Sequence, residues 1–178
     1  MAITRIGPNQ SINLASNITG TLPTGNGGTG ATSFAPGKVL QVVTASTTTQ
    51  SASSSSTFAN VANLTAAITP SSSSNKILIS VFCNGVGKET NNAYMGLRLL
   101  RGSTDIALID HLVGLNGGSA SNYIGTSGIM YLDSPSTTSA TTYKMQFSSE
   151  ANNANVFINR PNSSKVATST ITLMEVSA

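Results

Sequence analysis

The chain has 178 residues, of which nine are Lys or Arg and six are Asp or Glu, so charged residues make up only 8% of it. An average soluble domain has about 25% charged residues, and here 27 Ser, 23 Thr and 17 Asn supply most of the polarity. The chain has one Cys, one His and no Trp, which excludes a disulfide framework, a structural zinc site and most His-dependent catalysis.

The basic residues give a net charge of +3 but are spread along the whole sequence, and only Arg98 and Arg101 lie close together. Nucleic-acid binding requires a concentrated basic surface, because affinity grows with the number of phosphates neutralised together. The longest apolar run, Ile77 to Cys83, is far shorter than a membrane span, and the first residues lack the apolar segment of a secretory signal. We therefore expect no nucleic-acid partner and no membrane insertion.

Residues 1–36 differ in composition from the rest of the chain. They contain six of the 16 glycines and three of the six prolines, and their apolar residues are isolated, with no sustained helical or strand period. Such a stretch buries too little apolar surface to fold alone. The sequence therefore predicts an extended arm over residues 1–36 that is held by a neighbouring chain, followed by one folded domain over residues 37–178.

From residue 37 onwards, short segments rich in β-branched and aromatic residues alternate with polar turns. No amphipathic helix separates them, and this spacing is typical of an antiparallel sandwich or barrel. We expect strands at 39–43, 58–64, 76–83, 94–100, 105–113, 123–132, 141–148, 155–159 and 170–176. A short helix over 62–68 is an alternative that its β-branched residues and Pro70 disfavour. The serine runs at 51–56 and 71–74 are expected to be loops.

The strands fall into two kinds according to which faces carry apolar residues. The segment 141–148 alternates, with Tyr143, Met145 and Phe147 expected to face inward. In 76–83 the two faces are Ile77, Ile79 and Val81 on one side and Leu78 and Phe82 on the other. In 105–113 they are Ile106, Leu108 and Leu112 opposite Ala107, Ile109 and Val113. A monomer with so few charges would hardly keep such second faces in water, so we expect a tight homo-oligomer.

The few ionisable residues give little ground for catalysis. His111, beside Asp110, is the one base available to a Ser–His–acid triad, and its place in a predicted strand favours a structural imidazole. The carboxylates that could pair for glycoside cleavage or bind calcium share no diagnostic spacing; they are Glu89, Asp105, Asp110, Asp133, Glu150 and Glu175. Cys83 lies amid apolar residues and is expected to be a buried free thiol. We therefore expect a nonenzymatic protein with no catalytic residue, no cofactor and no metal site.

Two short motifs stand close together in the arm, Ile18-Thr-Gly-Thr-Leu-Pro23 and Asn26-Gly-Gly-Thr-Gly30. The segment 14–32 that contains them closely resembles a sequence common in the tail-fibre proteins of tailed bacteriophages. Residues 37–178, with their Ser- and Thr-rich style and their ending at 169–176, resemble the small jelly-roll domains of phage fibre and virion-surface proteins. The resemblance implies an antiparallel, jelly-roll-like β-sandwich packed as a homotrimer on the virion and made in the host cytoplasm. It carries over no catalytic residue.

Two virion locations fit this resemblance, a short trimeric tail fibre or fibre tip and a trimeric protein that decorates the capsid. The chain is short and has no repeat shaft or coiled-coil heptads, and its fibre-type motif favours the tail. In both cases the arm would anchor the trimer to other virion proteins, with apolar residues that fill shallow pockets and glycines that let the backbone follow the partner. These docking residues are Ile6, Ile12, Leu14, Ile18, Leu22, Gly27, Gly28 and Gly30. A carbohydrate-binding module is a further alternative.

A fibre tip would also need a surface that contacts the host. Asn, Ser and Thr side chains donate and accept hydrogen bonds and so suit the hydroxyl groups of a host surface glycan. The polar loops near 88–92, 116–122 and 150–155 are candidates for this surface, with solvated turns as the alternative interpretation. The expected contact residues are Asn91, Asn92, Asn116, Asn122, Tyr123, Asn152 and Asn153.

Overall fold

A computed structural model describes residues 38–90, 93–113, 123–151, 153–161 and 164–178. The chain divides into two units, residues 1–36 and residues 37–178, and all described residues belong to the second unit. They contain no helix, and hence none that is long and apolar enough to cross a membrane.

The described residues form ten strands, which are β1 (Val39–Thr47), β2 (Ser51–Ser53), β3 (Ala59–Ile68), β4 (Lys76–Lys88), β5 (Met95–Arg101), β6 (Thr104–Val113), β7 (Tyr123–Asp133), β8 (Thr141–Ser149), β9 (Val156–Ile158) and β10 (Ser169–Val176). All pairings between them are antiparallel. The expected all-β, antiparallel sandwich is therefore confirmed.

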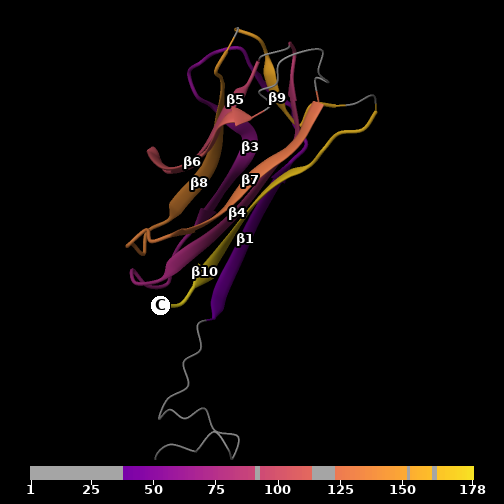
Figure 1. Cartoon of the computed structure of the whole chain (residues 1–178). Coiled ribbons are helices and arrows are strands. Elements are labelled where there is room, and N and C mark those ends of the chain that lie inside the picture. The colour runs from indigo at the N-terminus through magenta and orange to yellow at the C-terminus, as the bar shows by residue number, and fades with distance from the viewer. Residues whose placement is uncertain (1–37, 91–92, 114–122, 152, 162–163) are drawn as a thin grey trace, which may run out of the picture. The chain divides into compact units, whose positions relative to one another are not determined.

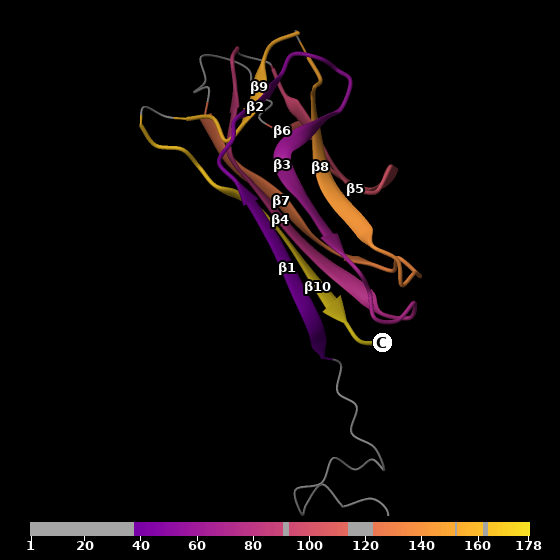
Figure 2. The same ribbon diagram turned by 180° about the vertical axis from the view of Figure 1, so that it is seen from behind.

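The strands build two sheets that pack face to face (Figure 1, Figure 2). In the first sheet β1, β10, β4 and β7 lie side by side, and the short strands β9 and β2 continue it beside the far end of β4. The second sheet has the order β3-β8-β5-β6. Leaving the two short strands aside, this is the eight-stranded order of a jelly roll, in which the chain crosses repeatedly between two four-stranded sheets.

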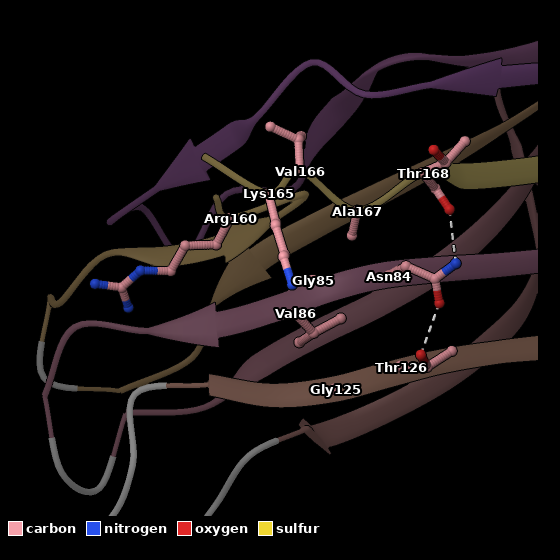
Figure 3. A pocket seen from close by; sticks show the side chains of 10 residues that line it. All are labelled: Asn84, Gly85, Val86, Gly125, Thr126, Arg160, Lys165, Val166, Ala167 and Thr168. Atoms are coloured by element: carbon pink, nitrogen blue, oxygen red, sulfur yellow. Dashed lines mark hydrogen bonds between the residues drawn. The ribbon is translucent and has the colours of Figure 1, made fainter. Parts of the chain in front are cut away.

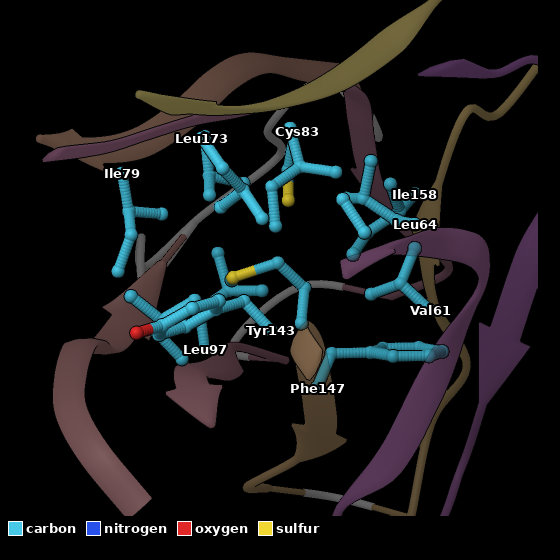
Figure 4. Packing of buried hydrophobic residues seen from close by; sticks show 14 of the residues in the cluster. Val61, Leu64, Ile79, Cys83, Leu97, Tyr143, Phe147, Ile158 and Leu173 are labelled. Carbon is cyan, nitrogen blue, oxygen red and sulfur yellow. The ribbon is translucent and has the colours of Figure 1, made fainter. Parts of the chain in front are cut away.

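The hydrophobic core lies between the two sheets (Figure 4). Ile77, Ile79 and Val81 of β4 face it from the first sheet, and Tyr143, Met145 and Phe147 of β8 face it from the second; none of the six is more than 1% exposed. These are the inward residues that the alternating pattern predicts. Cys83 belongs to the same cluster and is a buried free thiol, as expected.

The helix over 62–68 that the sequence disfavours does not form, because these residues belong to strand β3. Two local expectations are wrong. Residues 51–53 form strand β2 rather than a loop, because Ser51 is buried and its hydroxyl accepts a hydrogen bond from the amide of Ala62 at 2.8 Å. Ile106 packs against the core together with Ala107 and Ile109, because the pairing of β5 with β6 is irregular and breaks the simple alternation of faces.

Candidate functional site

The two ends of the sandwich differ in what they present. At one end β1 begins, β10 ends and β4 begins, and these strand ends pair through Val39, Val176 and Lys76. The described chain therefore enters the domain at this end, which we call the entry end. At the opposite end Gly87 of β4 pairs with Tyr123, the first residue of β7. We call this the loop end.

All three predicted receptor loops connect strands at the loop end. The strand ends that flank them pair with one another, since Met95 at the start of β5 is opposite both Val113 of β6 and Ser149 of β8. Of the predicted contact residues, Asn153 is exposed and has a positive φ of 46°, and Tyr123 is placed by its backbone as the first residue of β7. The remaining five, Asn91, Asn92, Asn116, Asn122 and Asn152, lie outside the described residues, as do all eight predicted docking residues of the arm.

The outer face of the first sheet carries large apolar side chains. Three rows run across β1, β10, β4 and β7, and they are Val42, Met174, Leu78 and Leu132; Thr44, Thr172, Ser80 and Met130; and Ser46, Thr170, Phe82 and Gly128. No residue in these rows is charged. Val42 is 57% exposed, Met130 65% and Leu132 51%. We call these twelve residues the apolar face. It includes Leu78 and Phe82, which the sequence predicts to form a second apolar side of β4.

The outer face of the second sheet is polar by comparison. The guanidinium group of Arg98 on β5 donates to the Gln146 side chain at 2.7 and 2.9 Å and to Asp105 at 3.1 Å. Gln146 in turn donates to Asn60 at 2.9 Å. Arg98 also lies over the ring of Phe58, 4.2 Å from its centroid. This outer face carries paired charged and polar groups, with Leu108 as its exposed large apolar residue, whereas the apolar face exposes several large apolar residues and no charged one.

A buried carboxylate ties three segments together at the entry end. Glu175 of β10 is 1% exposed and accepts hydrogen bonds from the amide and hydroxyl of Ser71, from Asn75 and from Gln41, all between 2.6 and 2.7 Å. Burial alone would raise the pKa of Glu175, but the hydrogen bonds from Asn75, Gln41 and Ser71 outweigh it and lower the pKa to about 2. The cluster fixes the serine-rich 71–75 turn against β10.

A second buried carboxylate joins the two sheets. Asp133 at the end of β7 accepts a hydrogen bond from the Tyr143 hydroxyl at 2.6 Å and two hydrogen bonds from Arg101 at 2.8 and 2.9 Å. Burial and the bond to Asp133 raise the pKa of the Tyr143 hydroxyl. These three residues come from β7, β8 and β5, so the ion pair links the sheets across one edge of the core.

The remaining carboxylates with described side chains also bind neighbouring groups. Glu89 accepts two hydrogen bonds from Asn155, and Glu150 accepts one from Ser148. His111 and Asp110 lie on β6, where only the backbone is described. Among the described residues, no group of three or more His, Cys, Asp or Glu could hold a metal ion.

A cavity of about 470 Å³ lies near the loop end, between the β9–β10 connection and strands β4 and β7 (Figure 3). Its lining residues are Asn84, Gly85, Val86, Gly125, Thr126, Arg160, Lys165, Val166, Ala167 and Thr168. Gly85 has a φ of +58°, and a Cβ there would lie 3.0 Å from the side chain of Ala167, so glycine allows this close approach of two segments. The sequence analysis missed this cavity, because its residues come from three distant segments and form no motif.

Comparisons with known proteins give little further information. No protein-family model and no curated protein matches the chain. Among solved structures, that of the infectious bursal disease virus Gx strain is similar, with a TM-score of 0.34 and 12% sequence identity. The match covers 79% of this chain and 38% of the other, so the chain spans less than half the length of that neighbour. A likeness this weak supports no statement about function.

Proposed function

We propose that this chain is a nonenzymatic structural protein of a bacteriophage virion, a short trimeric tail fibre that its N-terminal arm anchors to the tail. The apolar face of the first sheet is the observation that carries the proposal, because it calls for a covering partner. The fibre-like segment 14–32 and the jelly-roll topology agree with it. Jelly rolls occur in viral capsid and lectin domains, but the fold alone assigns no function.

Self-association accounts for the apolar face better than an unrelated charged partner does. The three rows of the face offer no charged group for an ion pair, and their polar members are Ser and Thr side chains. Every copy of the chain carries the same face, so three copies around a common axis can bury it together. The paired polar groups around Arg98 then remain on the outside, in water.

The difference between the two ends of the domain suits a protein that is attached at one of them. The described chain enters at the entry end, whereas the three predicted receptor loops connect strands at the loop end. An anchor that precedes β1 would therefore leave the loop end free to meet a host surface. A trimeric capsid decoration protein would share this arrangement, and it is the second candidate; a carbohydrate-binding module outside a virion is the third.

Deletion of residues 1–32 tests the anchoring role. We expect the truncated protein to remain a folded trimer, as measured by light scattering and circular dichroism, and to be absent from purified particles, as measured by immunoblotting. Incorporation of the truncated protein at the wild-type level would contradict the anchoring role. Loss of the trimer would instead make the arm part of the oligomer.

One measurement separates a fibre tip from a decoration protein. A fibre tip predicts that the isolated trimer blocks phage adsorption to host cells, whereas a decoration protein predicts no effect.

The variant His111→Ala tests the nonenzymatic assignment. It should fold and enter particles normally. A hydrolytic activity on host glycans that this variant loses would refute the assignment.

A further inference from the structure

The cavity near the loop end combines positive charge with hydrogen-bonding groups. Lys165 and Arg160 are the basic residues in its lining, and its described lining residues include no Asp or Glu. Lys165 is exposed, and its ammonium group has no hydrogen-bond or ion-pair partner among the described residues. An anion that enters the cavity therefore meets an available cation without displacing an acidic side chain.

The two basic side chains have different roles in this arrangement. Lys165 reaches from the β9–β10 connection towards Gly85 on β4, while the guanidinium group of Arg160 extends away from Asn84 (Figure 3). Arg160 donates to the backbone oxygen of Lys88 at 2.5 Å and lies over Phe157, 4.4 Å from the ring centroid. Arg160 thus adds fixed positive charge to one end of the cavity, and Lys165 is the flexible group that can bind directly.

The opposite side of the cavity holds two linked hydrogen bonds within a lining that is mostly apolar. Thr126 of β7 donates to Asn84 at 2.6 Å, and Asn84 donates to the backbone oxygen of Thr168 at 2.6 Å. These bonds link β7, β4 and the segment before β10, and they leave acceptor capacity on the Thr126 hydroxyl. Ala167 and the 49%-exposed Val166 supply apolar contacts, whereas the side chain of Val86 is buried in the core beneath the cavity. A ligand that fits this lining has an anionic group for Lys165, a hydroxyl that can donate to Thr126, and apolar C–H surface.

We propose that this cavity binds an anionic sugar, a carboxylate- or phosphate-bearing unit of a glycan, with its charge on Lys165. The volume of about 470 Å³ falls within the range of roughly 300–1,000 Å³ that is usual for small-molecule sites and greatly exceeds the space that a lone ion needs. The cavity borders the loop end, where a receptor surface is expected. The proposal rests on the proposed function only for the source of the glycan, because binding to the cavity can be measured with the isolated protein.

The test is a titration of the full-length protein with four probes, in which binding is measured by calorimetry or ligand-observed NMR. Glucuronic acid carries a carboxylate, glucose 6-phosphate carries a phosphate, glucose has the ring without charge, and inorganic phosphate has the charge without a ring. We expect one or both charged sugars to bind at one site per chain and at least about tenfold more tightly than glucose and inorganic phosphate, because charge-assisted hydrogen bonds are the stronger kind. The charged sugar that binds more tightly shows whether the glycan ligand carries uronic-acid or phosphate groups.

Two matched variants assign the binding to the cavity. Lys165→Gln removes the available cation and should weaken binding of the charged sugar by about tenfold or more. Lys144→Gln, on the outer side of β8 in the other sheet, removes the same charge elsewhere and should leave the affinity unchanged. Circular dichroism should show the same fold for both variants. The wild-type affinity for the charged sugar should also fall as the NaCl concentration rises.

Several results would overturn the proposal. Equal affinity for glucose and the charged sugars would remove the role of charge, and equal affinity for inorganic phosphate would reduce the cavity to a simple anion site. Unchanged binding in Lys165→Gln would place the site elsewhere. Absence of the protein from virions would refute the proposed function while leaving a positive titration intact, so the two failures are distinguishable.

Discussion

Replacing Leu132 with serine should weaken the proposed trimer while leaving the protomer folded. Leu132 lies on β7 in the first row of the apolar face and is 51% exposed. Full burial of a leucine contributes about 1.5–3 kcal/mol, so covering its exposed half in the oligomer contributes roughly 1 kcal/mol per protomer. Adding Met130→Ser, at a residue that is 65% exposed, removes roughly 1–2 kcal/mol more per protomer.

The double variant Met130→Ser/Leu132→Ser should therefore lose about 2–3 kcal/mol of association free energy per protomer, a change of roughly 30- to 150-fold for each contact. Both side chains point outward, so the domain itself should lose no more than about 1 kcal/mol each from lower strand preference. Light scattering over a dilution series should show wild-type protein at three times the chain mass of 18.1 kDa and the variant dissociating at higher concentration.

A matched substitution on the other sheet provides the control. Leu108 of β6 is 58% exposed and pairs with Arg98 on the polar side of the sandwich. Leu108→Ser makes the same chemical change as Leu132→Ser at a similar exposure, and it should leave the mass unchanged. The reasoning would be refuted if the two substitutions affected assembly equally, or if the double variant kept the wild-type mass at every concentration.

Three further predictions concern the fold. Glu175→Gln should lower the free energy of unfolding by about 2–3 kcal/mol at pH 7. Because the pKa of Glu175 in the folded protein is lowered to about 2, this difference from wild type should persist above the ordinary carboxyl pKa and vanish as the pH falls through 2. Urea titrations at neutral and at acidic pH measure the difference, and a value that stays constant with pH would contradict the prediction. Burial raises the pKa of Cys83 to about 12, so its thiol should resist alkylation at pH 8 until the protein is unfolded; rapid labelling of the native protein, measured by mass spectrometry, would count against this. Gly128→Ala would bring a Cβ within 2.1 Å of the backbone oxygen of Val81 and should separate β7 from β4, with a loss of about 3 kcal/mol or more; an unchanged thermal midpoint would show that the strands adjust freely.

Much of this fold is predictable because its strands obey a simple alternation. Tyr143, Met145 and Phe147 face the core as a period of two requires, and the doubly apolar character of β4 marks the apolar face in advance. The short strand β2 was not predictable, because Ser51 is buried through a hydrogen bond to Ala62 and not through an apolar side chain.

The candidate site was predictable only in part. The polar loops at 88–92, 116–122 and 150–155 are visible in the sequence as turns, and the strand pairings bring their flanking strands to one end of the sandwich. The cavity has no sequence signal, since Asn84, Thr126 and Lys165 meet only after β4, β7 and the β9–β10 connection have folded together. Whether these side chains can bind a ligand depends on which of their hydrogen-bonding groups the tertiary contacts leave unused.

Immunogold electron microscopy of purified phage particles, with an antibody raised against the isolated domain, tests the central claim most directly. A short tail fibre anchored by its arm predicts gold label at the tail and none on the capsid. Label on the capsid surface would contradict the tail-fibre assignment in favour of a decoration protein, and unlabelled particles would contradict a virion role altogether.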